Sequence, residues 1–256
     1  MLYYKGVQPF CYMPILIALN RNNLFPVSRR CLLAQQSAQL ASSFKAKEMS
    51  VTPKIEREEG DHPLQTAWTI WYDKKQSKKT DTTEFRGQLQ KIASFDSVEG
   101  FWKLYCHLKR PSTLENNVNF HLFREGPTNA PMWEAYPRGG CWILKIKKRK
   151  DSGASVLGKM WQDIVLAAIG EGFEEPDVVG ISLCIRRNED LLSVWNVDNR
   201  NDEIRFKIGE RMKKILDLEP STIIEYKHHA ESMQDMSTFR NAKAYVFAAS
   251  ETTVQA

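Results

Sequence analysis

The chain has 256 residues, which is enough for one large domain or two small ones with a substantial hydrophobic core. Its formal net charge of +5 arises at the N-terminus, because residues 1–47 hold six Lys or Arg and no acid. The remainder carries 30 basic and 31 acidic side chains, which excludes binding through a generally basic surface.

Residues 1–60 differ in composition from the rest and are predicted to form an N-terminal extension, disordered or outside the core. Their apolar run MPILIALN is much shorter than the roughly 20 residues that span a bilayer. The lack of acids before Glu48, with Arg and Ser throughout, is typical of mitochondrial targeting by residues 1–47. Two alternatives stand beside targeting: a disordered tail, or translation that starts at Met49.

The first predicted strand opens the folded part, which we expect to cover residues 61–250 before a short tail at 251–256. The stretch LQTAWTIWYD alternates so that Trp68 and Ile70 share one face while Trp71 lies on the other. The next segment, KKQSKKTDTTE, is predicted to be a solvated loop of charged and hydroxyl residues.

Three amphipathic helices are expected. Asp96 followed by Glu99 is a capping pattern, and Ser155 can cap the second helix. The third helix ends before Pro220. Their apolar stripes consist, respectively, of Val98, Trp102, Tyr105 and Leu108; of Leu157, Met160, Trp161, Ile164, Val165 and Ala168; and of Ile204, Ile208, Met212 and Ile215.

Further strands are expected at about 118–123, 142–147, 178–187, 191–197, 222–228 and 244–248. Several follow one another directly, as strands of hairpins do. Three helices among about eight strands predict an α+β fold, in which helices cover one face of a mainly antiparallel sheet.

Enzyme signatures are missing from the sequence: it contains no GxSxG, GxGxxG or P-loop motif, and its acids form no pair at a defined spacing. Five scattered cysteines, never spaced as CxxC, predict reduced thiols and neither a disulfide framework nor a zinc site. The adjacent His228 and His229 would point apart on a strand. We therefore expect no catalysis, no cofactor and no metal.

The run PMWEAYPRGGCW places Trp133 and Glu134 together in a loop between prolines. Most of the seven tryptophans are expected in the core, but Trp133 fits that role badly. An aromatic face stacks on a nucleobase, and a carboxylate accepts from a donor edge; guanine alone presents a ring N–H beside an amino group. A positively charged 7-methylguanine would add a cation–π attraction, given a second aromatic ring.

Six motifs occur in an order that resembles the eukaryotic translation initiation factor 4E family of messenger-RNA cap-binding proteins. They are HPLQTAWTIWY (62–72), FDSVEGFW (95–102), PMWE (131–134), GGCW (139–142), WQDIVLAAIGE (161–171) and RRNEDLLSVWN (186–196). The stretches SVEGFW, CHLKRPSTL, EDLLSVWN and EYKHH are more similar to the divergent branch of 4E-homologous and plant novel cap-binding proteins.

The resemblance implies a curved, mainly antiparallel eight-stranded sheet with three helices on its convex face and the cap on the concave one. It implies that Trp133 and Phe85 sandwich the base and that Glu134 accepts from the guanine edge. It further implies that Trp195 contacts the methyl group and that Arg186 binds the phosphate bridge.

The resemblance also implies a groove on the convex face for proteins that carry a helical binding motif with a Tyr and a Leu, such as initiation scaffolds or translational repressors. The residues at the matching positions are His62, Pro63, Val98, Trp102, Leu166, Ile169 and Gly170. For the apolar members, plain core packing is an equally good interpretation.

Three departures from the family pattern lead us to expect weaker cap binding than that of the general factor. Leu191 and Cys141 stand where cations are usual, and the PMWE box is shifted by two residues within a loop of preserved length. Phe85 also offers less stacking area than Trp. The predicted function is cap binding in cytoplasmic translation initiation or its regulation; the alternative is a scaffold with little cap binding.

Overall fold

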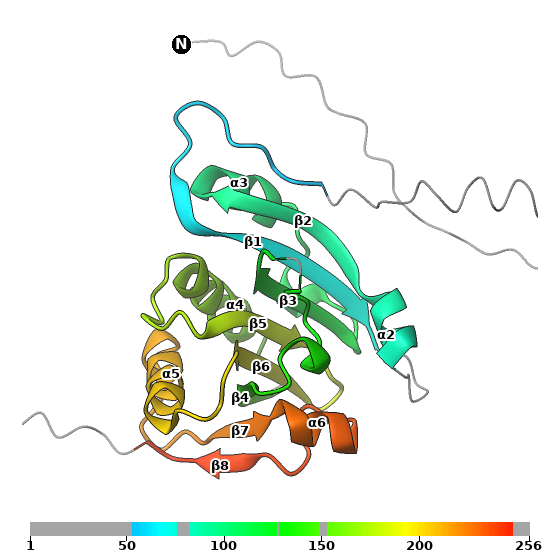
Figure 1. Cartoon of the computed structure of the whole chain (residues 1–256), viewed down its shortest axis with the longest axis vertical. Coiled ribbons are helices and arrows are strands. Elements are labelled where there is room, and N and C mark those ends of the chain that lie inside the picture. The colour runs from blue at the N-terminus through cyan, green and yellow to red at the C-terminus, as the bar shows by residue number, and fades with distance from the viewer. Residues whose placement is uncertain (1–52, 76–81, 127, 149–152, 248–256) are drawn as a thin grey trace, which may run out of the picture. The chain divides into compact units, whose positions relative to one another are not determined.

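One curved sheet of eight strands organises the folded part of the chain (Figure 1). The computed structural model describes residues 53–75, 82–126, 128–148 and 153–247. Every strand pairs antiparallel with its neighbours, in the order β2-β1-β3-β5-β6-β4-β7-β8. The predicted α+β class with an eight-stranded antiparallel sheet is confirmed.

The strands are β1 (Pro63–Lys74), β2 (Gln90–Ser97), β3 (Val118–Arg124), β4 (Gly140–Lys147), β5 (Val178–Cys184), β6 (Glu189–Asn196), β7 (Ile224–His228) and β8 (Lys243–Tyr245). The α-helices are α2 (Thr82–Gln88), α3 (Val98–Tyr105), α4 (Gly153–Ile169), α5 (Asp202–Ile215) and α6 (His229–Asp235). Two single 3₁₀ turns are η1 (Pro111–Thr113) and η2 (Trp133–Ala135).

Strand alternation divides the buried apolar side chains between the two faces of the sheet. Trp68 and Ile70 of β1 belong to a cluster that also contains apolar residues of α3, α4 and α5. Trp71 belongs to a separate cluster with Cys141 and Trp195. We call these the helix face and the open face. The alternation predicted for the first strand is confirmed.

The three predicted helices correspond to α3, α4 and α5, but their ends differ from the prediction. Ser97, not Asp96, caps α3, because its Oγ accepts from the backbone N–H of Gly100 at 3.0 Å while Asp96 pairs with Arg57. Ser155 lies inside α4 rather than at its cap. The cap of α5 is Asn201, whose side chain accepts from the backbone N–H of Ile204.

Three elements were not predicted: β2, α2 and α6. Within β2, Ser94 is buried, and its hydroxyl bonds to Thr69 Oγ1 at 2.8 Å and to Glu125 Oε2 at 2.6 Å. A buried serine whose hydroxyl is hydrogen-bonded interrupts the apolar pattern by which a buried strand is recognised in a sequence. The solvated loop predicted at 74–84 is wrong from Thr82 onward, where α2 begins, and residues 76–81 lie outside the described ranges.

Part of the predicted N-terminal extension lies against the sheet. The backbone N–H of Ile55 donates to Ser94 O at 2.8 Å, and Ser94 N–H donates to Pro53 O at 3.0 Å. Residues 53–55 therefore extend along the edge strand β2. The remaining predictions for residues 1–52 and 251–256 fall outside the described residues, and the domain limits stay a prediction.

Candidate functional site

Trp133 and Glu134 occupy η2, a single turn between β3 and β4. The backbone N–H of Tyr136 closes the turn onto Trp133 O at 3.0 Å. Met132 is buried beneath the turn, Trp133 is half-buried and Glu134 is exposed. The turn thus leaves part of the Trp133 ring and the Glu134 side chain accessible to solvent.

Tyr136 anchors this turn to the open face. Its side chain is only 5% exposed, and its ring centroid lies 6.1 Å from that of Phe123. Its carbonyl oxygen accepts from Gly139 N–H and from His229 Nδ1, both at 2.9 Å. His229 returns a second bond, since its backbone N–H donates to Gly139 O at 3.0 Å.

His228 ends β7 and His229 begins α6, so the assignment of both histidines to a strand is wrong at His229. Burial lowers the pKa of His229 to about 4, which keeps the ring neutral at physiological pH. Because Tyr136 O can only accept, Nδ1 carries the proton. The ring centroid lies 4.5 Å from that of Trp195.

Trp195 lies near the C-terminal end of β6, belongs to the open-face cluster and is 4% exposed. It packs edge-on against Phe123, with ring centroids 5.3 Å apart. Within the described part of the chain, its Nε1, the hydroxyl of Tyr136 and Nε2 of His229 are buried without hydrogen-bond partners. Unpartnered polar atoms are costly in a core, and this aromatic cluster contains three of them.

Arg186 follows β5 and is held by a chain of side chains on the open face. Its Nη1 donates to Asn119 Oδ1 at 2.7 Å. Asn119 Nδ2 in turn donates to Asp73 Oδ2 at 2.7 Å. The other oxygen of Asp73 lies 2.7 Å from His121 Nε2, and His121 Nδ1 lies 2.7 Å from Ser182 Oγ. Three neighbouring strands therefore position one cation.

Phe85 is half-buried on α2, which precedes the edge strand β2. Among the described residues, neither Phe85 nor Trp133 has a ring contact with another aromatic side chain. Both side chains are half-buried, and Trp133 packs in part against the open-face cluster.

Cys141 and Leu191, the two departures at usual cation positions, are buried in the open-face cluster. Burial raises the pKa of the Cys141 thiol to about 12, so the thiol stays protonated and uncharged. Neither position can supply a charge to an anionic ligand.

On the helix face, Trp102 and Val98 of α3 are 42% and 37% exposed. Of the seven tryptophans, five are buried, and only Trp102 and Trp133 are not. Next to Trp102, Glu99 accepts from the backbone N–H of His62 and pairs with its ring at 2.8 Å, which raises the pKa of His62.

The other predicted groove residues divide by exposure. Pro63 and Gly170 are exposed and Leu166 is half-buried. Ile169 is 5% exposed and belongs to the core, so it offers little surface to a partner.

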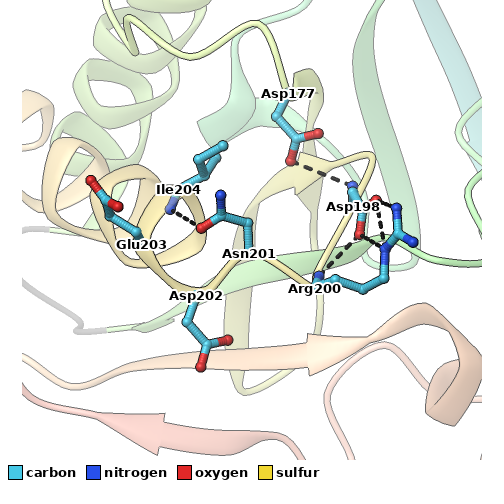
Figure 2. A pocket seen from close by; sticks show the side chains of 7 residues that line it. All are labelled: Asp177, Asp198, Arg200, Asn201, Asp202, Glu203 and Ile204. Atoms are coloured by element: carbon cyan, nitrogen blue, oxygen red, sulfur yellow. Dashed lines mark hydrogen bonds and ion pairs between the residues drawn. The ribbon is translucent and has the colours of Figure 1, made fainter.

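A separate cavity of about 730 Å³ lies at the start of α5 (Figure 2). Its lining consists of Asp177, Asp198, Arg200, Asn201, Asp202, Glu203 and Ile204. The lining contains four carboxylates and one guanidinium, that of Arg200, which pairs with Asp198. Such a lining repels phosphates, and it includes none of the predicted site residues.

The described ranges contain no group of three or more His, Cys, Asp or Glu that could hold a metal ion. Over the same residues, no helix is long and apolar enough to cross a membrane.

Comparisons with known proteins agree with this architecture. The family model for eukaryotic initiation factor 4E matches residues 63–244. Eukaryotic translation initiation factor NCBP of Triticum aestivum is 38% identical over 185 residues, which cover 71% of this chain and 76% of that protein.

Two solved structures are also similar to this chain. Ascaris suum eIF4E-3, solved with an m7G cap, is 34% identical with a TM-score of 0.60, and the match covers 68% of this chain and 94% of that one. C. elegans eIF4E-3, solved with the 4E-binding protein Mextli, is 31% identical with a TM-score of 0.62, covering 68% and 97%. This chain therefore belongs to the eukaryotic initiation factor 4E family.

Proposed function

We propose that this protein binds the 7-methylguanosine cap of messenger RNA on the open face of its sheet and acts in translation initiation or its regulation. The observation that carries the proposal is the η2 turn, where a half-buried tryptophan stands beside an exposed carboxylate. Trp133 and Phe85 supply stacking surfaces, and Glu134 accepts from the guanine edge. Trp195 is 4% exposed, so only a small part of its ring would adjoin the methyl group. Arg186, positioned by Asn119, binds the phosphate bridge.

Titration of the full chain with 7-methylguanosine triphosphate tests this proposal. Stacking on Trp133 should quench tryptophan fluorescence in a saturable way, because that ring is half-exposed before binding. Unmethylated GTP should bind at least about tenfold more weakly, since it lacks the positive charge that strengthens stacking. Equal affinity for the two nucleotides would contradict cap recognition.

We further propose that the exposed part of α3 binds a helix from a partner protein. The support is the exposure of Trp102 and Val98 on a helix whose neighbouring aromatic residue, Phe101, is fully buried. A tryptophan left 42% exposed is suited to be an interface anchor, because its ring supplies area and its N–H can donate to a partner. C. elegans eIF4E-3, a relative of this chain, was solved with the 4E-binding protein Mextli, which supports a protein partner for this family.

Replacing Trp102 by Ala should weaken binding of a labelled peptide with the Tyr/Leu helical motif by about 30-fold or more, which is typical of an interface hot spot. Anisotropy of the peptide reports this loss, and Trp102→Phe should retain part of the affinity. Titration with 7-methylguanosine triphosphate should be unchanged, because Trp102 lies on the helix face. Loss of both activities in Trp102→Ala would mean that the ring is a core residue.

The proposed role is that of a non-enzymatic binding protein in the cytoplasm. The family model is that of an initiation factor, and the three cysteines in the described ranges are free, which suits a reducing compartment. The alternative, a scaffold with little cap binding, would retain peptide binding at α3 but show no saturable quenching by the nucleotide.

A further inference from the structure

Asp73 is a fully buried carboxylate on the open face, and neither the family motifs nor the predicted site includes it. It lies on β1, 1% exposed, and is not paired with an arginine or lysine in the described part of the chain. A buried ionised carboxylate is costly unless hydrogen bonds satisfy it. Here both oxygens are satisfied, one by Asn119 and the other by His121.

The direction of these bonds follows from the chemistry of the groups. An ionised carboxylate only accepts, so Asn119 must turn its Nδ2 and His121 its Nε2–H toward Asp73. An amide with its nitrogen fixed in this way must turn its oxygen the opposite way. That oxygen accepts from Arg186 Nη1 at 2.7 Å. Asp73 thereby sets which end of the Asn119 amide faces Arg186.

A guanidinium has five N–H donors, and Arg186 Nη1 is held by Asn119 and by its own neighbour Ile185 O at 2.9 Å. The guanidinium remains only half-buried, so it keeps donors for an anion. If the amide of Asn119 turned over, Nδ2 would face Nη1, and two donors would confront each other. The side chain of Arg186 would then leave its present position.

We infer that Asp73 and Asn119 are positioning residues, which hold the Arg186 guanidinium in place for the phosphate bridge of the cap. This inference rests on the proposed function, because it assigns the phosphate contact to Arg186. We call the hydrogen-bonded chain from Ser182 through His121 and Asp73 to Asn119 the relay. The relay has no proposed role in base recognition, so disrupting it should affect only ligands that carry phosphates.

The test compares 7-methylguanosine triphosphate with the nucleoside 7-methylguanosine, each titrated by fluorescence against the full chain. The measured quantity is the ratio of the two affinities, which isolates the phosphate contribution. Asp73→Asn should lower this ratio about tenfold, as expected when a charge-assisted hydrogen bond is misplaced. Affinity for the nucleoside should change less than about twofold.

A charge swap separates positioning from a general structural role. In Asp73→Asn/Asn119→Asp, the new carboxylate can accept from both Arg186 and Asn at position 73, whose oxygen can still accept from His121. Every bond of the relay regains a donor and an acceptor, so the double variant should fold and recover the ratio to within about twofold.

The outcomes are distinguishable. A wild-type chain that binds neither ligand overturns both the proposed function and this inference. If the wild type binds both ligands, an unchanged ratio in Asp73→Asn overturns the inference alone, as does a folded charge swap without recovery. If Asp73→Asn does not fold, the affinity ratio is compared among the wild type, the charge swap and Asn119→Leu. The inference expects a lowered ratio only in Asn119→Leu, and any other result overturns it.

Discussion

Replacement of Glu134 by Gln should lower the affinity for 7-methylguanosine triphosphate by about 100-fold or more. The carboxylate accepts from two N–H groups of guanine at once, whereas an amide offers one oxygen and places a competing donor at the other end. Each hydrogen bond to a charged group contributes about 1.5–3 kcal/mol, and each 1.4 kcal/mol is a factor of ten. Fluorescence titration measures the effect.

The matched control is Glu210→Gln, a similar change at an exposed position on α5, which should leave the affinity unaltered. Thermal unfolding of Glu134→Gln should match the wild type, because Glu134 is exposed. A Glu134→Gln chain that binds the nucleotide as tightly as the wild type would show that the η2 turn does not read the guanine edge.

Replacement of Tyr136 by Ala should reduce both the stability of the fold and cap affinity. Deleting a buried aromatic ring costs about 3–5 kcal/mol, and denaturant unfolding should report a loss in that range. The turn would also lose its ring contact with Phe123, so Trp133 and Glu134 would no longer be fixed against the open-face cluster. We expect a loss of at least about tenfold in affinity, measured well below the unfolding midpoint.

Two variants isolate the anchoring role of this ring. Tyr136→Phe keeps the ring and removes a buried hydroxyl that has no partner within the described chain, so stability and affinity should be retained or slightly improved. Phe173→Ala removes a buried ring from the helix face and should lose comparable stability without losing affinity. If Tyr136→Ala also keeps its affinity, the turn is held by its backbone bonds alone.

The helices and most strands could be predicted because their patterns are local. Apolar residues at helical spacing marked α3, α4 and α5, and the alternation around Trp68 and Trp71 assigned both faces of β1. The strand β2 was not predicted, because the hydrogen-bond partners that allow Ser94 to be buried, Thr69 and Glu125, are distant in sequence. Its burial depends on partners that no short window contains.

The part of the candidate site that is local in sequence could be predicted, and the part that depends on distant residues could not. Trp133 and Glu134 are adjacent in sequence, so the prediction that they act together needed no tertiary contact, and their motif carried the family resemblance. Asp73 could have been placed on the face of Trp71 by its spacing of two residues, but nothing local connects it with Asn119, 46 residues further on. His229 was misplaced on a strand, because the start of α6 at that residue depends on its contacts with Tyr136 and Gly139.

Residue types and short-range spacing were therefore sufficient to specify the family, the two faces of the sheet and the ring and carboxylate of η2. The orientation of Arg186, the anchoring of the shifted loop by Tyr136 and the exposure of Trp102 required the folded chain. Each of these depends on hydrogen bonds or packing between segments that are far apart in sequence, and such contacts exist only once the strands have paired.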